Sequence, residues 1–532
     1  MFLRPTCPDE VFKTIFMLKN TNSVGPDELS TKILKISADI IALVMSHLIN
    51  LSFEHGIFPN KLKFYMIKPL HKQGDKTLMN KYRPMALLPV ISKIFEKIFK
   101  KRLISFLDKF SIIRDEQFGF QTNKSTTLAI YNLVKDISQL IDIRKPAVVM
   151  FFDMTKAFDH VDHKTLLEKC NCYGIRGTAL DWIKSYLENR QQFVRIDSLV
   201  NDEMMSFDSS TRVNTFGVPQ GSVLGPILFL LYINDLPEIS QYRSILFADD
   251  ISILISSNKE GLENEINLTI ESVVEWLESN NLQVNLDKTT YVQFQNYNNK
   301  KMGLTVKHKN KTIKESDTVK FLGVTIDRNC NWKSHIENVC NKLNRFVYVL
   351  YRLSRITGQK AALAAYHGYV LSVLRYGLLI WGNSTDFNKA FIVQKKCLRA
   401  IYGKKQTDSC KPLFKKSKIM TLVSMYILEA AIHVKSNPNL YKKAGNIVNF
   451  DIRNKERLVL PKHNSALYSK NCHIMTIKVY NCIPHEIKQL PLKLFKHKLK
   501  YWLTENVFYS INDFFNYKRM NYKLNYEIAN EF

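Results

Sequence analysis

The sequence predicts a mixed α+β core followed by an α-helical, strongly basic part. Two apolar runs with the composition of buried strands, residues 147–153 and 244–255, carry carboxylates at an end or turn. From about residue 334 to 403 the pattern is helical and basic. Because 532 residues exceed what one compact core usually holds, we expect two or three domains.

The expected elements alternate between the two periodicities. Helical spacing appears twice in residues 1–50, the second time at Leu34, Ile41, Val44, Leu48 and Leu51. The remaining elements, in chain order, are a strand at 64–70, a helix at 92–107, a strand at 147–153, a helix from Lys156 onward interrupted near Gly174, two strands around an acidic turn at 244–255, and a helix at 262–277.

The charge is unevenly distributed. Lys and Arg number 76 against 48 Asp and Glu, and residues 331–532 alone hold 34 basic and 11 acidic side chains. Such a cationic part attracts a polyanion, either nucleic acid or an anionic membrane surface. The sequence shows no secretory signal and no membrane span, so we expect nucleic acid. Nine scattered cysteines indicate reduced thiols in an intracellular protein.

The sharpest chemical feature is the pairing of Asp153, at the end of one apolar strand, with Asp249 and Asp250 in the turn of an apolar hairpin. Unpaired carboxylates are costly next to buried segments, and Mg²⁺ is a natural partner for converging carboxylates. Two such ions can support phosphoryl transfer. Each Asp alone is explained as well by a turn or helix cap, but both sites together favour a metal-dependent centre.

Seven motifs in one order extend this interpretation. They are residues 74–84 with GD and KYRP, 117–126 with QFGF and ST, 152–159 (FDMTKAFD), 217–226 (GVPQGSVLGP), 247–250 (FADD), 285–289 (NLDKT) and 321–324 (FLGV). In this order they resemble the motifs of reverse transcriptases. Together with the GPD element at 25–27, the residues of these motifs are most similar to those of non-LTR (LINE-type, Jockey-like) retrotransposon reverse transcriptases.

The resemblance implies roles for individual residues. Asp153, Asp249 and Asp250 would be catalytic and, with the Met154 carbonyl, would hold two Mg²⁺ ions, with Mn²⁺ as a possible substitute. The dNTP would be bound by residues from several motifs: Lys72, Arg83, Phe158, Gln220, Gly221 and Lys288. The Phe158 ring would exclude a 2′-hydroxyl, and Lys288 would stand near the leaving pyrophosphate as a proton donor.

The same resemblance implies a right-hand polymerase fold. Its expected parts are an N-terminal fingers extension at 1–50, fingers and palm at 51–330, a helical thumb at 331–410 and a basic C-terminal region at 411–532. Lysines would contact the phosphates of a nucleic acid, and the interleaved Tyr402 and Phe414 would offer rings for base stacking. The lysines chosen are Lys395, Lys396, Lys404, Lys405, Lys415 and Lys416.

The function implied is RNA-directed DNA polymerase, extending a DNA primer on an RNA template in the nucleus or cytoplasm. Expected partners are template RNA, primer or target DNA, dNTPs and a separate endonuclease, because no nuclease or RNase H signal is visible in the sequence. Two alternatives stay open. A catalytically silent RNA-binding component of a ribonucleoprotein would keep the fold and the charge, and a metal nuclease would use the carboxylates but leave GVPQG unexplained.

Overall fold

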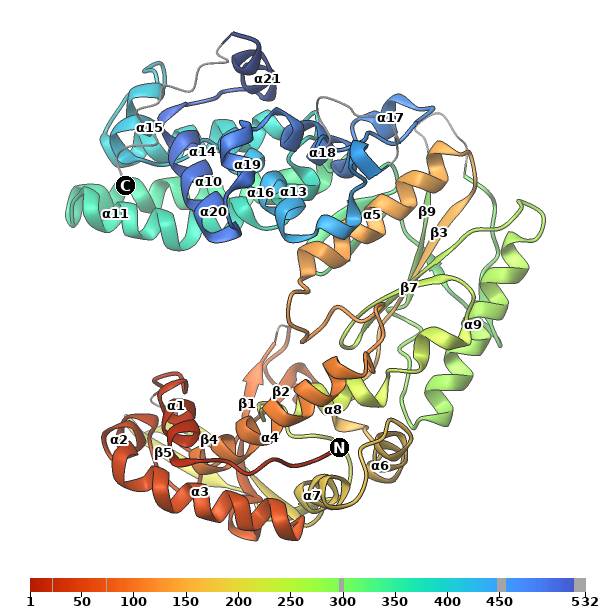
Figure 1. Cartoon of the computed structure of the whole chain (residues 1–532), viewed down its shortest axis with the longest axis vertical. Helices are drawn as coiled ribbons and strands as arrows, with labels where there is room; N and C mark the ends of the chain where they lie inside the picture. The colour runs from red at the N-terminus through yellow and green to blue at the C-terminus, as the bar shows by residue number, and fades with distance from the viewer. Residues whose placement is uncertain (22, 73, 296–300, 447–455, 521–532) are drawn as a thin grey trace.

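The computed structural model describes residues 1–520 apart from 22, 73, 296–300 and 447–455, so parts of the predicted C-terminal region lie outside the described residues. The chain is C-shaped (Figure 1). An N-terminal arm forms one end of the C, a central sheet forms its back, and a helical body forms the other end.

The N-terminal arm combines helices with a sheet of strand order β2-β1-β4-β5, in which β6 also pairs with β4 and β1 runs parallel to β4. Its elements are α1 (Pro8–Phe16), α2 (Thr31–Ile36), α3 (Ala38–His55), β1 (Phe64–His71), β2 (Tyr82–Leu87), α4 (Val90–Lys109), α6 (His163–Cys172), α7 (Thr178–Leu187), β4 (Arg190–Val200), β5 (Glu203–Asp208) and β6 (Arg212–Asn214).

Helix α3 confirms the helical spacing in the second part of residues 1–50 and is apolar on two sides. Its buried side is formed by small and large residues such as Ala42, Met45 and Ile49. Val44 and Leu48, which share the predicted apolar spacing, are 57% and 45% exposed. Periodicity therefore identified the helix, but packing against α1 and α7 chose the other side as the core face.

The central sheet has the strand order β12-β9-β3-β8-β7. All six residues of β3 are buried, and alternate ones enter different cores because successive strand side chains point to opposite faces. One core lies toward the N-terminal arm and the other toward the helical body. The elements of this part are α5 (Thr126–Asp142), β3 (Ala147–Phe152), α8 (Gly225–Tyr232), β7 (Arg243–Phe247), β8 (Asp250–Ile255), α9 (Leu262–Ser279), β9 (Thr290–Phe294), β10 (Lys307–His308), β11 (Lys311–Thr312), β12 (Lys314–Glu315), β13 (Thr318–Phe321) and β14 (Val324–Asp327).

The segment after β3 differs from the prediction. A helix was expected from Lys156 onward, but Lys156 has a left-handed backbone with φ of 47°, and only a single 3-10 turn, Ala157–Asp159, follows it. The α-helix begins at His163, where the Asp162 side chain caps it by accepting from Thr165 N–H at 2.8 Å. The predicted interruption near Gly174 is confirmed, since α6 ends at Cys172.

The helical body contains the predicted thumb and the described part of the predicted C-terminal region. Residues of both parts, such as Leu343, Phe414 and Trp502, belong to one hydrophobic core, so no separate core begins at residue 411. Its helices are α10 (Lys333–Ile356), α11 (Gln359–Ala365), α12 (Leu371–Arg375), α13 (Leu378–Trp381), α14 (Phe387–Tyr402), α15 (Lys411–Ser417), α16 (Leu422–Ser436), α17 (Ala466–Ser469), α18 (Cys472–Cys482), α19 (His485–Gln489), α20 (Leu492–Glu505) and α21 (Ile511–Met520).

Helix α5, which packs on the central sheet, also forms hydrogen bonds with the helical body. The Tyr131 hydroxyl lies 2.8 Å from the Tyr441 hydroxyl and 2.7 Å from His473 Nδ1, all buried. At the end of the same helix, the Asp142 carboxylate accepts hydrogen bonds from the backbone of residues 464–465. Within the described ranges no single helix is long and apolar enough to cross a membrane, although α15 and α16, bent by 55°, meet that test as a pair.

Candidate active site

Two neighbouring strands of the central sheet place three carboxylates at one end of the sheet. Asp153 directly follows β3, and Asp249 and Asp250 lie at the turn between β7 and β8. β3 pairs antiparallel with β8, with Phe152 opposite Ile251. The structure therefore brings together the three acidic residues that the sequence singled out.

These carboxylates repel one another. Burial and the neighbouring Asp249 and Asp153 carboxylates raise the pKa of Asp250 to about 6. The pKa of Asp249 is also raised, chiefly because surrounding protein atoms disfavour its charged form, while Arg83 and Lys72 oppose the shift. Both aspartate side chains are nevertheless exposed enough for a cation or a substrate to reach them. A repulsive acidic cluster of this kind favours a positively charged partner.

The buried side chain of Gln117 stabilises the turn that carries Asp249. Its amide oxygen accepts hydrogen bonds from Ala248 N–H at 3.1 Å and from Gly119 N–H at 2.8 Å. Gly119 permits the close approach, because a Cβ there would lie 2.6 Å from the Ala248 nitrogen. The QFGF motif marked this segment in the sequence, but only the structure reveals that Gln117 supports the acidic turn.

Lys288 lies beside the first carboxylate. Its Nζ is 3.4 Å from Asp153 Oδ2, and its backbone N–H donates to the Asn285 carbonyl at 3.1 Å. Asn285 in turn donates its N–H to the Asp153 carbonyl at 2.7 Å, so the loop before β9 is tied to the end of β3. The structure thus places Lys288 beside Asp153, and its position near the leaving pyrophosphate and its role as a proton donor stay predictions.

Lys72 and Arg83 come from the β1–β2 hairpin of the N-terminal arm. Lys72 follows β1 and donates its backbone N–H to the Lys81 carbonyl at 2.9 Å, and Arg83 lies opposite Leu70 in the β1–β2 register. Both side chains are exposed. Their positive charges oppose the upward shift of the Asp249 pKa, and exposed cations of this kind suit the binding of a triphosphate.

Two residues of the FDMTKAFD motif, Met154 and Phe158, already have contacts within the protein. Met154 forms a bridge with Val284, and the two hydrogen bonds of that bridge use Asp153 and Thr155 rather than the Met154 carbonyl. Phe158 is half-buried, and its ring stacks on Phe229 of α8 with centroids 4.4 Å apart. Phe158 is thus at least a packing residue, and its predicted contact with the sugar stays a prediction.

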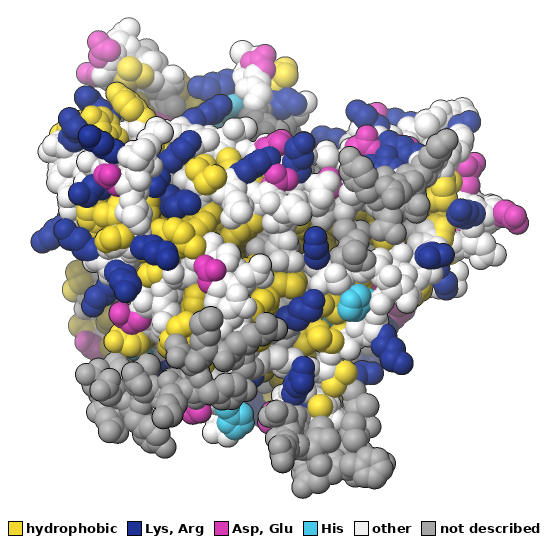
Figure 2. Space-filling view, turned by 90° about the horizontal axis from the view of Figure 1, so that it is seen from above, with side chains coloured by type: hydrophobic (Ala, Val, Ile, Leu, Met, Phe, Trp, Pro, Cys, Tyr) yellow, Lys and Arg dark blue, Asp and Glu magenta, His cyan; other side chains and the backbone are white. Residues whose placement is uncertain are grey.

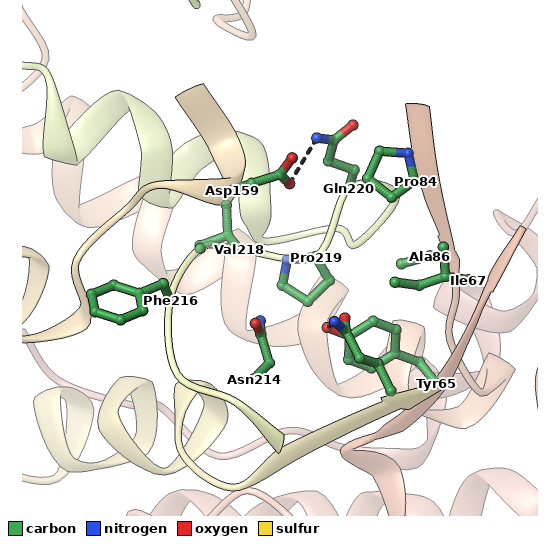
Figure 3. A pocket seen from close by; sticks show the side chains of 12 residues that line it. Tyr65, Ile67, Pro84, Ala86, Asp159, Asn214, Phe216, Val218, Pro219 and Gln220 are labelled. Atoms are coloured by element: carbon green, nitrogen blue, oxygen red, sulfur yellow. Dashed lines mark hydrogen bonds between the residues drawn. The ribbon is translucent and has the colours of Figure 1, made fainter. Parts of the chain in front are cut away.

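The glycine-rich loop lies between the FDMTKAFD segment and β2 (Figure 3). Gln220 Nε2 donates to Asp159 Oδ1 at 2.8 Å, and the Gln220 carbonyl accepts from Ala86 N–H at 2.8 Å. Gly221 has a φ of 121°, and a Cβ there would lie 2.8 Å from the Ala86 carbonyl oxygen. Beneath the loop is a cavity of about 140 Å³ that Tyr65 of β1 and Phe216 also line.

The chemistry of the carboxylates fits a divalent cation that prefers oxygen ligands. Burial, together with repulsion by Asp249 and Asp153, raises the pKa of Asp250, and such a cation would favour its charged form. No group of three His, Cys, Asp or Glu side chains in the described part of the chain has its ligating atoms already gathered for a metal. The carboxylates are thus chemically suited to such a cation, but among the described residues they are not arranged as a ligand set.

The six C-terminal lysines lie on α14, on α15 and in the loop between them. In Figure 1, α15 is farther from the N-terminal arm than α10 and α11, and Figure 2 shows that Lys and Arg outnumber Asp and Glu on the face seen from above. Lys395 is only partly exposed, with its Nζ 4.7 Å from the Phe391 ring centroid. Phe414 is fully buried, so the predicted stacking of a base on it is wrong.

Helix α10 presents a basic stripe that the sequence reasoning missed. Its buried side carries Ile336, Leu343 and Leu350, and Tyr348 on the opposite side is 65% exposed. The exposed basic residues around that tyrosine are Lys342, Arg345, Arg352 and Arg355. Their spacing of three, seven and three residues was available in the sequence as the polar complement of the apolar positions.

Comparison with known proteins agrees with the motifs. Residues 70–326 match the family described as Reverse transcriptase (RNA-dependent DNA polymerase). The chain is 28% identical over 425 residues to the probable RNA-directed DNA polymerase from transposon BS of Drosophila melanogaster, covering 75% of this chain and 45% of that protein. It is 27% identical over 486 residues to the RNA-directed DNA polymerase from mobile element jockey of the same species, covering 86% and 51%.

The chain thus spans about half the length of these curated relatives. Among solved structures, apo telomerase from Candida tropicalis is 12% identical with a TM-score of 0.36, covering 69% of this chain and 62% of that chain. The family match, the ordered motifs and the jockey relative agree with one another: residues 70–326 form a reverse transcriptase domain, and the chain is similar to the RNA-directed DNA polymerases of Jockey-like non-LTR retrotransposons.

Proposed function

We propose that this chain is an RNA-directed DNA polymerase that extends the 3′-hydroxyl of a DNA primer on an RNA template. The observation that carries the proposal is the meeting of Asp153, Asp249 and Asp250 at one end of the central sheet, with Lys72 and Arg83 acting on them from the N-terminal arm. Members of the family generally use divalent metal ions, and here we propose two Mg²⁺, with Mn²⁺ as a substitute.

Each group of residues has a distinct task in this proposal. Asp153, Asp249 and Asp250, with the Met154 carbonyl, would hold the cations, which supply charge neutralisation and lower the pKa of the primer hydroxyl. The exposed cations at Lys72 and Arg83 would bind the triphosphate. The 3′-oxygen forms the new ester bond to the α-phosphorus as the bond to pyrophosphate breaks.

The remaining residues would orient the reactants. The Gln220–Gly221 segment would lie against the new base pair, since glycine at 221 lets the backbone approach closely. Phe158 would contact the sugar, and Lys288 beside Asp153 could donate a proton to the leaving pyrophosphate. The helical body would hold the template–primer duplex through its basic side chains, with template RNA, primer DNA and dNTPs as the bound partners.

The test is primer extension on poly-rA/oligo-dT with Mg²⁺ and dTTP. Wild type should extend the primer, and Asp153→Asn and Asp249→Asn proteins should lose synthesis by at least about 10³-fold, because the substitution removes charge where the reaction develops it. Asp287→Asn, at an exposed carboxylate of the NLDKT motif, is the matched control and should retain synthesis. Near-normal synthesis by the Asp249→Asn protein would overturn the assignment, and binding without extension by wild type would favour the silent RNA-binding alternative.

A further inference from the structure

Glu96 of α4 is a fully buried carboxylate in the N-terminal arm, outside the seven motifs. Its four donors are neutral groups. Ser92 Oγ donates to Oε1 at 2.9 Å, and Oε2 accepts from the Tyr186 hydroxyl at 3.2 Å and from the backbone N–H groups of Val223 and Leu224 at 2.7 and 3.1 Å. A buried charge is costly unless hydrogen bonds compensate it, so this arrangement needs an explanation.

The two backbone donors identify what Glu96 holds. Val223 and Leu224 come directly after the Gln220–Gly221 segment and directly before α8, which begins at Gly225. Free N–H groups at the start of a helix favour a negative charge. Glu96 therefore fixes the chain at the point where the glycine-rich loop becomes a helix.

Other contacts fix the loop from the opposite side. Val218 N–H donates to the Phe158 carbonyl at 2.9 Å, and the Gln220 carbonyl accepts from Ala86 N–H at 2.8 Å. These bonds tie the beginning and middle of the loop to the FDMTKAFD segment and to β2. Without Glu96 the loop would keep these two attachments but lose the one at its C-terminal end.

Tyr186, one of the donors to Glu96, also contacts a buried positive charge at Arg190. The Arg190 guanidinium is 4.7 Å from the Tyr186 ring centroid, is 1% exposed, and donates to the Tyr186 carbonyl at 3.0 Å. Its Nε and Nη2 have no hydrogen-bond partner among the described residues. Tyr186 therefore contacts a buried carboxylate through its hydroxyl and a buried guanidinium through its ring.

We propose that Glu96 is a positioning residue for the nucleotide site, acting through the glycine-rich loop. This proposal rests on the proposed function, because the Gln220–Gly221 segment contacts the incoming nucleotide only if the chain is a polymerase. The charge is required: one oxygen accepts three hydrogen bonds, and a neutral amide oxygen would hold the two loop N–H groups more weakly. Loss of this hold should let the segment move and weaken nucleotide binding without removing any group that touches the nucleotide.

The test compares Glu96→Gln with Ser92→Ala. Both remove interactions of the same buried carboxyl group, but Ser92→Ala leaves the two loop hydrogen bonds intact. In primer extension, Glu96→Gln should raise the KM for dNTP about tenfold with a smaller change in kcat, and Ser92→Ala should change the KM less than about threefold. Hydrogen exchange of residues 217–225 should accelerate in Glu96→Gln and not in Ser92→Ala.

A double-mutant cycle with Gln220→Ala shows whether the effect passes through the loop. If Glu96 positions Gln220, the two substitutions should raise the KM for dNTP by less than the product of their separate effects. Strictly multiplicative effects, or equal loop exchange in Glu96→Gln and Ser92→Ala, would overturn the proposal. If Glu96→Gln fails to fold, Glu96→Asp keeps the charge but shortens its reach and should accelerate loop exchange in the same way.

The hydrogen-exchange comparison needs no catalysis. If wild type makes no DNA but Glu96→Gln still accelerates exchange at residues 217–225, the proposed polymerase function fails while the positioning of the loop stands. If wild type makes DNA and the exchange of the loop is unchanged by Glu96→Gln, the polymerase function stands and the positioning role fails.

Discussion

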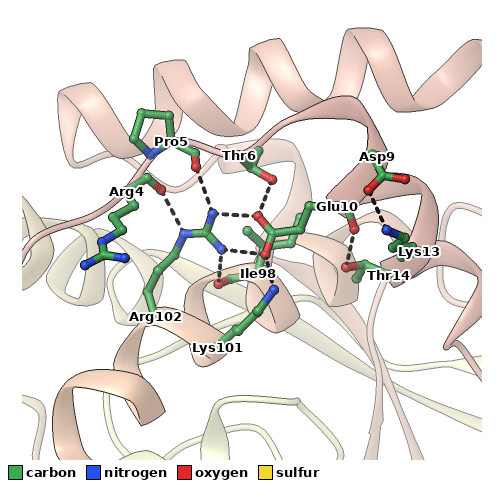
Figure 4. A network of polar contacts seen from close by, with 10 residues as sticks. All are labelled: Arg4, Pro5, Thr6, Asp9, Glu10, Lys13, Thr14, Ile98, Lys101 and Arg102. Atoms are coloured by element: carbon green, nitrogen blue, oxygen red, sulfur yellow. Dashed lines mark hydrogen bonds and ion pairs between the residues drawn. The ribbon is translucent and has the colours of Figure 1, made fainter. Parts of the chain in front are cut away.

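Glu10 should make the docking of α1 on α4 dependent on pH (Figure 4). Its carboxylate accepts hydrogen bonds from Arg102 Nη2 at 2.7 Å, from Lys101 Nζ at 2.7 Å and from Thr6 Oγ1 at 2.8 Å. The Arg102 guanidinium also donates Nε to the Arg4 carbonyl at 2.8 Å. The side chains of Arg102 and Glu10 are only 9% and 18% exposed, so solvent screens this pair less than a surface ion pair.

The expected magnitude follows from the pKa of Glu10. The hydrogen bond from Arg102 is the largest cause that lowers this pKa from 4.5 to about 2. At about 1.4 kcal/mol per pKa unit, the shift corresponds to at most about 3.5 kcal/mol, and we expect about 2 kcal/mol after partial solvent screening. Because the folded pKa is the lower one, this stabilisation is fully present above about pH 5 and is lost as the pH falls toward 2.

The assay is native-state hydrogen exchange of residues 8–16 in wild type and Glu10→Gln, between pH 7 and pH 3. Glu10→Gln should reduce the free energy of local opening of α1 by about 2 kcal/mol at pH 7, and the difference should shrink as the pH approaches 3. Asp9→Asn is the matched control, because Asp9 and its partner Lys13 are 67% and 66% exposed, so solvent screens their ion pair and its loss should have a much smaller effect. An effect of Glu10→Gln that is equal at both pH values, or one matched by Asp9→Asn, would refute the reasoning.

Three further predictions concern the site and the duplex. Phe158→Val should raise ribonucleotide incorporation relative to dNTP use, and an unchanged ratio in an active variant would leave Phe158 as a packing residue only. Gly221→Ala should reduce synthesis at least about tenfold in primer extension, since its Cβ would lie 2.8 Å from the Ala86 carbonyl oxygen at a φ of 121°; wild-type rates would show that the loop tolerates displacement. Removing the charges of four lysines on and before α15 should flatten the salt dependence of template–primer binding and shorten the products, while the affinity for dNTP stays unchanged. If only removal of the basic residues of α10 had these effects, the duplex-binding surface would be assigned to α10 instead. The two sets of residues are Lys404, Lys405, Lys415 and Lys416, and Lys342, Arg345, Arg352 and Arg355.

The central strands were predictable because their almost continuous apolar composition indicates burial on both faces of a sheet. Residues 147–153 were expected as a strand and form β3 over Ala147–Phe152, which is buried on both faces. The acidic hairpin and the helix at 262–277 were likewise confirmed as β7, β8 and α9. In each case the local pattern and the tertiary environment demand the same structure, so the sequence was sufficient.

The helix expected from Lys156 failed for a non-local reason. Phe158 and Asp159 are held by the glycine-rich loop, whose Val218 and Gln220 lie about 60 residues later in the chain. Those contacts fix a single 3-10 turn where periodicity favoured a longer helix. The roles of Gln117 and Glu96 could not be predicted for the same reason. Nothing in their local sequence reveals that Gln117 accepts a hydrogen bond from the backbone of Ala248, or Glu96 from that of Val223.

The position of Asp153 on the central strand makes its substitution informative. β3 is locked by its two neighbours, and its alternate side chains are buried in two different cores. The carboxylate itself lies past the end of that strand and is 41% exposed, so an asparagine of the same shape removes charge without opening a cavity in either core. The substitution relieves the repulsion with Asp249 and Asp250 and weakens the contact with Lys288 at 3.4 Å, and that exposed pair contributes little to stability. Loss of synthesis in a folded Asp153→Asn protein would therefore report on the chemistry of the site and not on the stability of the sheet.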